Sequence, residues 1–346
     1  MADPRFHRMR VSEVIAETPD SHSLVLEVSP DLAARFTYRP GQFLTVRIPG
    51  EGRGSVARCY SLASSPYTGD KLKITVKRVP DGYGSNWICD NVTAGTVLDA
   101  LPPAGNFTPR SLDGDLLLFA GGSGITPVMS IIKSALARGS GRIVLVYANR
   151  DERSVIFGEE LRQLTADNQQ RLLTIHWLES VQGLPTLPLL RALARPYAAY
   201  EAFVCGPAPF MDAVTHALRG LDVPHGRVHV ERFLSLSGDP FRDTSVPAPS
   251  EAGPDRTSTV EVELDGQRHR FAWPRQTRLL DLLREQGLNA PFSCREGACS
   301  ACACRIEEGE VKMLRNEVLD EHDIAEGYVL ACQALPLTDT VKVNYD

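Results

Sequence analysis

The sequence predicts a multidomain fold in which an antiparallel β-barrel domain is followed by an α/β domain with a parallel sheet and by a small α+β domain. Short strands separated by turns fill the first 110 residues, and strands then alternate with helices up to residue 237. A stretch rich in Pro, Gly, Ser and Asp precedes the last segment. We therefore place domains at residues 1–110, 111–237 and 259–346, with a linker at 238–258.

The composition narrows the classes of function. With 346 residues, of which 43% are hydrophobic and 23% charged, the chain has room for two or three globular domains. The net charge of −6 argues against a nucleic-acid partner, and the longest apolar runs, at 116–120 and 143–147, are too short to span a membrane. The first residues lack a signal peptide's apolar core, so we expect a cytoplasmic protein with reduced thiols.

Acidic charge is concentrated near one end of the chain. Residues 255–346 contain 17 acidic and 11 basic side chains, whereas the remainder is balanced. Such an asymmetry would steer a positively charged protein partner towards this domain. A solvated acidic surface without a partner explains the composition equally well.

The barrel prediction depends on four strand-like runs and two polar motifs. "RCYS" offers Arg58 for a phosphate, Tyr60 for stacking on a ring and Ser61 for a hydrogen bond. "DGYGSNWICD" predicts a turn that leads into a short helix, with Ser85 as its N-cap and free N–H groups for a second phosphate contact. The runs themselves are 22–29, 42–50, 57–65 and 71–79.

Two glycine turns mark the α/β domain. "AGGSGITPVMSII" (120–132) follows an apolar strand and opens a helix, which lets phosphates approach backbone N–H groups. "FVCGPAPFM" (203–211) forms a second junction of the same kind. Neither is a G-x-G-x-x-G fingerprint, and a tight structural turn explains either one alone. Together they predict a ligand site at the C-terminal ends of parallel strands.

The C-terminal domain begins with a hairpin around Asp265-Gly266 and an amphipathic helix at 277–288. Four cysteines then occur within "FSCREGACSACAC" (292–304), and a fifth is Cys332. The spacing C-x4-C-x2-C followed by a distant cysteine is typical of plant-type [2Fe–2S] ferredoxins. It predicts metal ligands at Cys294, Cys299, Cys302 and Cys332.

The small residues of this cysteine loop would let the chain wrap a cluster closely, and Gly297 can adopt a positive φ. Cys304 is the extra thiol, which we expect to be a small buried side chain. The alternative is a zinc-binding module on an oxidoreductase, although structural zinc sites usually show two C-x2-C pairs and only one occurs here.

Taken together, these motifs resemble the ferredoxin–NADP⁺ reductase superfamily, in the subgroup that carries a C-terminal plant-type ferredoxin. Longer stretches resemble the reductases of 3-ketosteroid 9α-hydroxylases, among them "GSVARCYSLASSPYTGD", "YANRDERSVIFG" and "APFSCREGACSACAC". The resemblance covers nearly the whole chain apart from the linker. It implies a flavin-binding barrel, a pyridine-nucleotide domain and a β-grasp ferredoxin domain.

The resemblance also implies roles for individual residues. Arg58 would hold the flavin pyrophosphate, Tyr60 would lie against the isoalloxazine and Ser61 near its N5. Ser61, Cys205, Glu231 and Phe233 would be the catalytic side chains, with Glu231 and Phe233 of "VERF" facing the flavin. The remaining cofactor contacts would be Gly84, Ser85, Asn86, Gly122, Gly124, Ile125, Thr126, Pro127, Cys205, Gly206 and Pro207.

The implied activity is electron transfer from NADH, or NADPH, through FAD and a [2Fe–2S] cluster to a terminal oxygenase of the Rieske non-haem-iron type. A flavin suits this path because nicotinamide gives two electrons and the cluster takes one at a time. The alternative is a phenylacetyl-CoA-epoxidase-type reductase for a di-iron oxygenase. After the strand at 141–150, Arg150 or Arg153 could hold a 2′-phosphate and Asp151 could repel it. These residues therefore leave the choice between NADH and NADPH open, and the resemblance favours NADH.

Overall fold

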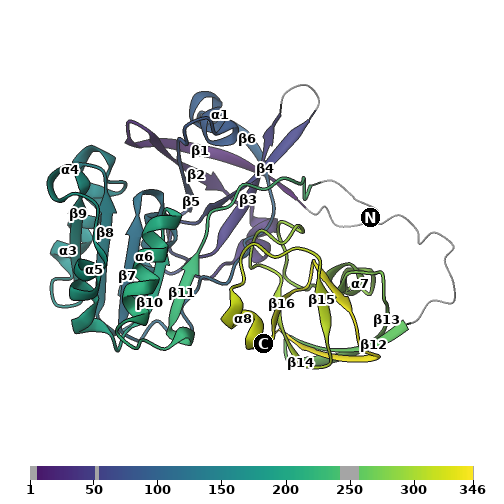
Figure 1. The fold of residues 1–346 in the computed structure, drawn as a ribbon. Coiled ribbons are helices and arrows are strands. Elements are labelled where there is room, and N and C mark those ends of the chain that lie inside the picture. The colour runs from purple at the N-terminus through teal and green to yellow at the C-terminus, as the bar shows by residue number, and fades with distance from the viewer. Residues whose placement is uncertain (1–5, 51–53, 242–256, 346) are drawn as a thin grey trace. The chain divides into compact units, whose positions relative to one another are not determined.

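The computed structural model describes residues 6–50, 54–241 and 257–345 (Figure 1). The chain divides into two compact units, one made of residues 1–50 and 58–233 and the other of residues 51–57 and 234–346. The predicted linker, 238–258, falls mostly on residues 242–256, which lie outside the described part. Its last two residues belong to the first strand of the C-terminal domain.

The N-terminal part of the first unit is an antiparallel barrel. Its six strands follow the order β4-β3-β6-β1-β2-β5, and a bridge between Leu62 and Ile74 joins the chain beyond β4 to β5. Alternating apolar residues fill the interior, as expected for strands with one buried face. The elements are β1 (His7–Thr18), β2 (Ser21–Glu27), η1 (Pro30–Phe36), β3 (Phe43–Pro49), β4 (Ser55–Ser61), β5 (Leu72–Lys77), α1 (Tyr83–Asn91) and β6 (Val97–Ala100).

The second part of the first unit is a parallel sheet in the order β11-β10-β7-β8-β9 with helices on both faces (Figure 1). All six residues of β7 are buried, as covering on both faces requires. The strands are β7 (Leu116–Gly121), β8 (Ile143–Asn149), β9 (Leu172–Leu178), β10 (Glu201–Cys205) and β11 (Val228–Glu231). The helices are η2 (Gly122–Gly124), α2 (Ile125–Arg138), η3 (Glu152–Ser154), α3 (Gly158–Asp167), α4 (Glu179–Gln182), α5 (Leu187–Ala194), η4 (Arg195–Tyr197), α6 (Ala208–Arg219) and η5 (His225–Arg227).

The strand order of this sheet creates a switch point. The chain runs from β7 outwards through β8 to β9, and it then returns to β10 on the other side of β7. The turns that leave β7 and β10 therefore open at neighbouring strand ends. In open α/β sheets a crevice for ligands forms at this place.

The C-terminal domain is a mixed sheet in the order β13-β12-β18-β14-β16, with α7 packed on its apolar core. The β12–β13 turn has Asp265 and Gly266 at positive φ, which confirms the predicted hairpin. This is the β-grasp arrangement expected from the sequence. The elements are β12 (Thr257–Leu264), β13 (Gln267–Pro274), α7 (Leu279–Glu285), β14 (Ala303–Glu308), β15 (Val311–Met313), α8 (Glu321–Ala325), β16 (Tyr328–Leu330), β17 (Ala334–Pro336) and β18 (Thr340–Asn344).

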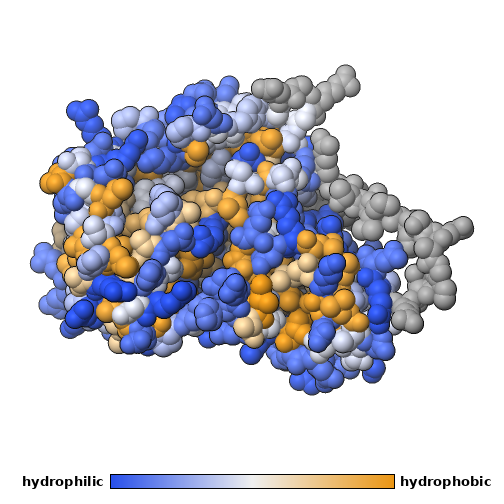
Figure 2. Space-filling view, in the orientation of Figure 1, coloured by the Kyte–Doolittle hydropathy of each residue, from blue (hydrophilic) through white to orange (hydrophobic). Residues whose placement is uncertain are grey.

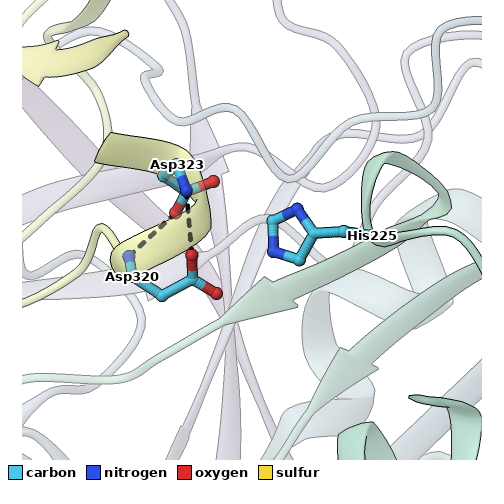
Figure 3. Close-up of side chains that lie close together, drawn as sticks. All are labelled: His225, Asp320 and Asp323. Carbon is cyan, nitrogen blue, oxygen red and sulfur yellow. Dashed lines mark hydrogen bonds between the residues drawn. The ribbon is translucent and has the colours of Figure 1, made fainter. Parts of the chain in front are cut away.

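The short helix α8 is held by its first turn. The Asp320 side chain accepts hydrogen bonds from the backbone N–H groups of His322 and Asp323, and the Asp323 carboxylate accepts one from the Asp320 N–H. Figure 3 shows this reciprocal capping box; His225, drawn in the same view, belongs to the first unit. The two carboxylates therefore have a structural role at a helix N-terminus.

On the face of the molecule that Figure 2 draws, hydrophobic residues lie in several groups among hydrophilic ones. Among the residues that the structure describes, no helix combines the length and the apolar character needed to cross a membrane.

Candidate functional site

The two glycine turns of the α/β domain meet at the switch point. A Cβ on Gly124 would overlap the carbonyl group of Cys205, and one on Gly206 would lie 3.0 Å from the Cα of Gly121. These positions exclude larger side chains because the two backbones touch. The turns thus present main-chain atoms at neighbouring strand ends, where phosphate groups can approach closely.

The turn after β7 is shaped by its contacts. Gly122 has a φ of +52°, and its carbonyl oxygen accepts a hydrogen bond from the Tyr147 hydroxyl at 3.1 Å. The same hydroxyl accepts one from the Ile156 N–H at 3.2 Å. Tyr147 therefore fixes the turn to the next strand of the sheet.

Lys77 is a candidate that the sequence analysis missed. Its Nζ would lie 3.7 Å from a Cβ placed on Gly122, and it pairs with Asp20 at 3.8 Å. Burial lowers the pKa of Lys77, while the attraction of Asp20 works in the opposite direction. In the sequence, a lysine in "KITVKR" is indistinguishable from a solvent-facing strand residue, so only the fold shows that it lies beside the glycine turn.

The predicted residues 125–127 lie in the first turn of α2. Ile125, Thr126 and Pro127 are all buried, and the Thr126 hydroxyl donates to the Ser123 carbonyl oxygen at 3.0 Å. Their side chains therefore anchor the start of the helix, and its first N–H groups follow the glycine turn directly.

Cys205 and Glu231 are direct neighbours across the β10–β11 pair. Burial raises the pKa of Glu231 to about 8, although the residue as a whole keeps some exposure. Burial and the nearby Glu231 raise the pKa of the Cys205 thiol well above its usual range. Both groups are therefore neutral at pH 7. Phe233 follows two residues later and is 46% exposed.

The flavin motif and the helix α1 are brought together in the barrel. A Cβ on Gly84 would lie 3.0 Å from the Arg58 Cγ, so this glycine lets the arginine pack against the first turn of α1. Tyr60 is half-buried, and burial raises the pKa of its hydroxyl. Ser61, at the end of β4, is 3% exposed. A guanidinium beside a helix N-terminus gives a cradle for phosphate.

The start of α1 differs from the prediction. The N-cap is Gly82, so Ser85 lies in the first turn and the N-cap prediction is wrong. The Ser85 hydroxyl accepts the Val79 N–H at 3.1 Å, and the Asn86 side-chain amide donates to the Val79 carbonyl oxygen at 3.1 Å. Both side chains fold back onto the preceding turn, which leaves the α1 backbone N–H groups at its entrance.

A buried ion network connects the barrel to the α/β domain within the first unit. Lys133 of α2 pairs with Asp70 and, at 2.9 Å, with Glu160 of α3, which also pairs with Lys73 of β5 at 3.1 Å. The Lys133 side chain is only 10% exposed. Although burial opposes it, Lys133 lowers the pKa of Asp70. The network fixes the relative position of the flavin motif and the glycine turns.

Two serine contacts reinforce this connection. The Ser130 hydroxyl donates to the Ser64 carbonyl oxygen at 2.7 Å, and the Ser134 and Ser65 hydroxyls are 2.8 Å apart. All four residues are buried, so the bonds are shielded from water.

The four predicted metal ligands converge in the C-terminal domain. The Cys299 thiol lies 3.1 Å from the Cys294 sulfur, and Cys332 is within hydrogen-bonding reach of Cys294 and Cys302. All four are buried. Hydrogen bonds from Cys299 and Cys332, together with backbone N–H groups, lower the pKa of Cys294. Four buried sulfurs with N–H donors fit an iron–sulfur cluster, whose ligands are thiolates.

The loop around these cysteines requires glycine at one position. Gly297 has a φ of +80°, as expected, and a Cβ there would lie 2.7 Å from the Arg315 carbonyl oxygen. The Gln333 amide group donates to the Arg295 carbonyl oxygen at 3.0 Å and lies 3.6 Å from the Cys332 sulfur. These contacts hold the loop next to the turn between β16 and β17, which carries Cys332.

Cys304 lies away from this group, in the sheet. Its thiol is 2% exposed and faces the Val329 carbonyl oxygen at 3.8 Å. Burial raises its pKa well above the usual range. A thiol in this environment stays protonated and packs as a small apolar side chain.

Three family models match successive parts of the chain. An oxidoreductase FAD-binding domain matches residues 8–108, an oxidoreductase NAD-binding domain residues 118–216, and a 2Fe-2S iron–sulfur cluster binding domain residues 262–337. The fold class predicted from the sequence is confirmed. The chain is an oxidoreductase that combines FAD, NAD and a [2Fe–2S] cluster.

Relatives define the family more closely. The ferredoxin reductase component of 3-ketosteroid-9-alpha-monooxygenase from Rhodococcus rhodochrous is 57% identical over 337 residues, which span 97% of this chain and 96% of that protein. The chain belongs to this family of ferredoxin reductase components, which work with an oxygenase partner.

A more distant relative and a solved structure are also similar to this chain. A component of the 1,2-phenylacetyl-CoA epoxidase from Escherichia coli is 32% identical over 99% of this chain and 98% of its own. The solved structure of phthalate dioxygenase reductase covers 98% of both chains with a TM-score of 0.58 and 24% identity, which supports the fold alone.

Proposed function

We propose that this protein is the reductase component of a 3-ketosteroid 9α-hydroxylase, which passes electrons from NADH through FAD and the [2Fe–2S] cluster to a terminal oxygenase of the Rieske type. The observation that carries the proposal is the 57% identity to a reductase of this system along nearly the whole chain. When bound, the flavin would supply the conversion of the two electrons of one hydride into two single-electron transfers. The cytoplasm, which provides NADH and keeps thiols reduced, is the proposed location.

In the proposed nucleotide site, the pyrophosphate lies on the turns that contain Gly122, Gly124 and Gly206. Pro207 and the first turn of α2 border this place, and Lys77 supplies the positive charge. The support is steric, because the contact between the two turns leaves main-chain atoms as the lining. A nearby cation and main-chain N–H groups at a helix start together suit a dianionic pyrophosphate.

NADH is favoured over NADPH by the carboxylate that follows β8. The Arg150 guanidinium lies 3.0 Å from the Asp20 carboxylate, which also pairs with Lys77, so Arg150 alone does not decide the choice. Asp151 caps η3 by accepting the Ser154 N–H at 2.9 Å, which holds a carboxylate after β8. A 2′-phosphate would meet this negative charge.

In the proposed flavin site, Arg58 and the first turn of α1, which contains Gly84, Ser85 and Asn86, hold the pyrophosphate. Tyr60 lies against the isoalloxazine and Ser61 near N5. Their shared location in β4 and α1 supports this assignment. The two residues act on orientation, so their removal changes the rate of hydride transfer more than the binding of flavin.

Cys205 and Glu231 form the proposed nicotinamide end of the site. Because both are neutral at pH 7, they surround the transferring hydride without adding charge. Phe233 covers the outer side of the flavin in this proposal, and its exposure of 46% leaves it free to turn away when nicotinamide enters.

For the cluster, Cys294, Cys299, Cys302 and Cys332 are the proposed ligands, and the convergence of their sulfurs supports this set. The oxygenase would dock through the acidic surface of the C-terminal domain, where a positively charged partner is steered. Exposed carboxylates on which this docking would depend include Glu307, Glu308, Glu317, Glu321 and Glu326.

The test is reconstitution with purified oxygenases. The protein, loaded with FAD and cluster, is mixed with NADH and either a steroid 9α-oxygenase or a di-iron phenylacetyl-CoA epoxidase. We expect 9α-hydroxylation of a 3-ketosteroid at least 100-fold faster than epoxidation. The Cys294→Ser protein should support neither reaction. Equal or greater support of the di-iron enzyme would contradict the proposal and favour the phenylacetyl-CoA type, to which the identity is only 32%.

A further inference from the structure

A single carboxylate binds the segment that follows Phe233. Within the second unit, Glu296 accepts three hydrogen bonds from two consecutive residues. Ser237 donates its N–H to Oε1 and its hydroxyl to Oε2, both at 2.8 Å, and the Gly238 N–H donates to Oε2 at 2.6 Å. We call these three bonds the Glu296 clasp.

Glycine at position 238 makes this approach possible. A Cβ there would lie 3.0 Å from Oε2 of Glu296, which is tighter than an ordinary contact. Ser237 and Gly238 are both exposed to solvent. The donors therefore exchange between the carboxylate and water, so the clasp can open without breaking the core.

The rest of the segment is ordered by its own contacts. Leu236 and Phe241 are 6% and 8% exposed. The Arg315 guanidinium donates to the Ser237 hydroxyl at 3.3 Å, and the Ser55 hydroxyl donates to the Asp239 carboxylate at 2.5 Å. Residues 236–241 thus form a strap, which includes the first part of the predicted linker.

Glu296 is also part of the cysteine loop. It stands two residues after Cys294, and its backbone N–H donates to the Cys294 sulfur at 3.5 Å. The same residue therefore contacts a proposed cluster ligand through its main chain and the strap through its side chain. A carboxylate at this place is a poor choice for the cluster itself, because negative charge disfavours a reduced cluster. The three hydrogen bonds that the Glu296 carboxylate accepts give it a structural role at this position.

We propose that Glu296 is a positioning residue for electron transfer into the cluster, because its carboxylate fastens the strap to the loop that holds the ligands. The strap is the stretch by which the chain enters the second unit after Phe233. In this proposal a closed clasp shortens the connection from Phe233 to the cluster loop, which would raise the fraction of time in which electron transfer is productive. This inference rests on the proposed electron path.

The step itself changes no bond at Glu296. The step would move one electron from bound, reduced flavin to the cluster, and the Glu296 carboxylate would keep its three donors throughout. An open clasp releases Ser237 and Gly238 from the cysteine loop, while Leu236 and Phe241 stay buried. The connection from Phe233 to the cluster loop is then longer, and the effective concentration of the loop at the flavin-binding unit falls. The expected effect of losing the clasp is therefore a slower electron transfer with unchanged hydride transfer.

The experiment compares Glu296→Ala with Glu310→Ala in the complete, cofactor-loaded protein. Glu310 is an exposed carboxylate of the same domain, so its removal matches the change in net charge. Hydrogen exchange of residues 234–241 should become at least 10-fold faster in Glu296→Ala. After a single NADH addition in stopped flow, cluster reduction should slow about 10-fold while flavin reduction is unchanged. Glu310→Ala should match the wild type in both measurements.

A purely electrostatic role for Glu296 and the proposed clasp predict opposite changes in the rate of cluster reduction. Removal of a negative charge beside the cluster favours its reduction, so a purely electrostatic role would leave cluster reduction equal or faster. Ser237→Ala tests the clasp from the other side, because it removes one of the three bonds and leaves the cysteine loop untouched. We expect this variant to show faster exchange at Gly238 and cluster reduction slowed about 2-fold.

Two outcomes would overturn the proposal. One is unchanged hydrogen exchange of the strap in both variants, which means that the clasp does not hold in solution. The other is faster exchange together with an unchanged or faster rate of cluster reduction. A wild-type protein that does not oxidise NADH would instead refute the proposed function, while the exchange measurement would still report on the clasp.

Discussion

The nucleotide end of the parallel sheet and the cysteine loop of the C-terminal domain are built in opposite ways. At the sheet, the site arises from missing side chains, because Gly124 and Gly206 let two turns touch. In the C-terminal domain, the site arises from side chains, because the sulfurs of three loop cysteines and of Cys332 lie within hydrogen-bonding reach of their neighbours. The glycine turns therefore have no room for a Cβ, whereas the proposed cluster site needs all four sulfur atoms.

The largest expected effect is at the thiolate site. Replacing Cys294, Cys299, Cys302 or Cys332 by serine should abolish the visible and EPR signals of the cluster, since each removes a ligand. Cys304→Ser should keep them. A colourless Cys304→Ser protein, with folding verified by circular dichroism, would mean that the ligand set is wrong. Zinc in place of iron and sulfide in the wild type would refute the cluster assignment.

The backbone site should fail when a methyl group is added. Gly124→Ala forces the Cys205 carbonyl group away, and such overpacking costs about 1–3 kcal/mol of the free energy of unfolding. We expect kcat/KM for NADH to fall about 100-fold with a generic electron acceptor. Gly226→Ala is the matched control, because a Cβ there meets no atom within 4 Å. Normal NADH kinetics in Gly124→Ala would show that the close approach is not needed.

The next prediction tests whether the ion network around Lys133 holds the glycine turns in place. Lys133→Met keeps the packing of the stem but leaves the carboxylates of Asp70 and Glu160 without this cation. Because both carboxylates are about a third exposed, we expect a loss of about 2 kcal/mol rather than the larger cost of a fully buried pair. Urea unfolding measures it, with Lys71→Met, an exposed lysine, as the control. Equal urea midpoints for Lys133→Met and Lys71→Met would show that the ion network does not stabilise the fold.

The last prediction, which concerns pH dependence rather than loss of activity, is at Glu231 of the proposed nicotinamide end. Because burial raises the pKa of Glu231 to about 8, the folded protein binds a proton that the unfolded chain has released. The stabilisation is complete below the unfolded pKa near 4.5 and is lost as the pH rises through about 8. Glu231→Gln should flatten the decline in melting temperature between pH 5 and 9. An identical decline in wild type and variant would contradict this pKa.

These two regions also differ in how far the sequence predicts them. The cysteine spacing predicts the cluster, which the match to a 2Fe-2S cluster binding domain confirms, and four ligands, which stay a prediction. Both follow from the sequence because each proposed ligand is a distinct residue type at a fixed interval. The glycine turn could be placed between strand and helix, but not its contact with the Cys205–Gly206 turn, which depends on β7 and β10 becoming neighbours. Short strands and the alternation with helices were sufficient for the fold class.

Residues without a distinctive pattern were missed. Lys77 and Tyr147 reach the Gly122 turn only through tertiary structure, and the sequence offers them as ordinary strand residues. The N-cap of α1 was predicted three positions too late, at Ser85. The actual N-cap is Gly82, which has an extended backbone and no side chain to form a cap. The Glu296 clasp escaped for the same reason, since its donors lie about 60 positions away in the chain.

The central pair of the C-terminal sheet has a consequence for how the protein matures. β12 and β18 pair in parallel, with Val260 opposite Val341, and all four proposed cluster ligands lie between them in the sequence. This long loop must close before the central pair exists, which makes its formation entropically slow. A cluster that ties Cys332 to the cysteine loop closes part of it in advance. The supply of iron and sulfide during synthesis should therefore govern the yield of folded protein.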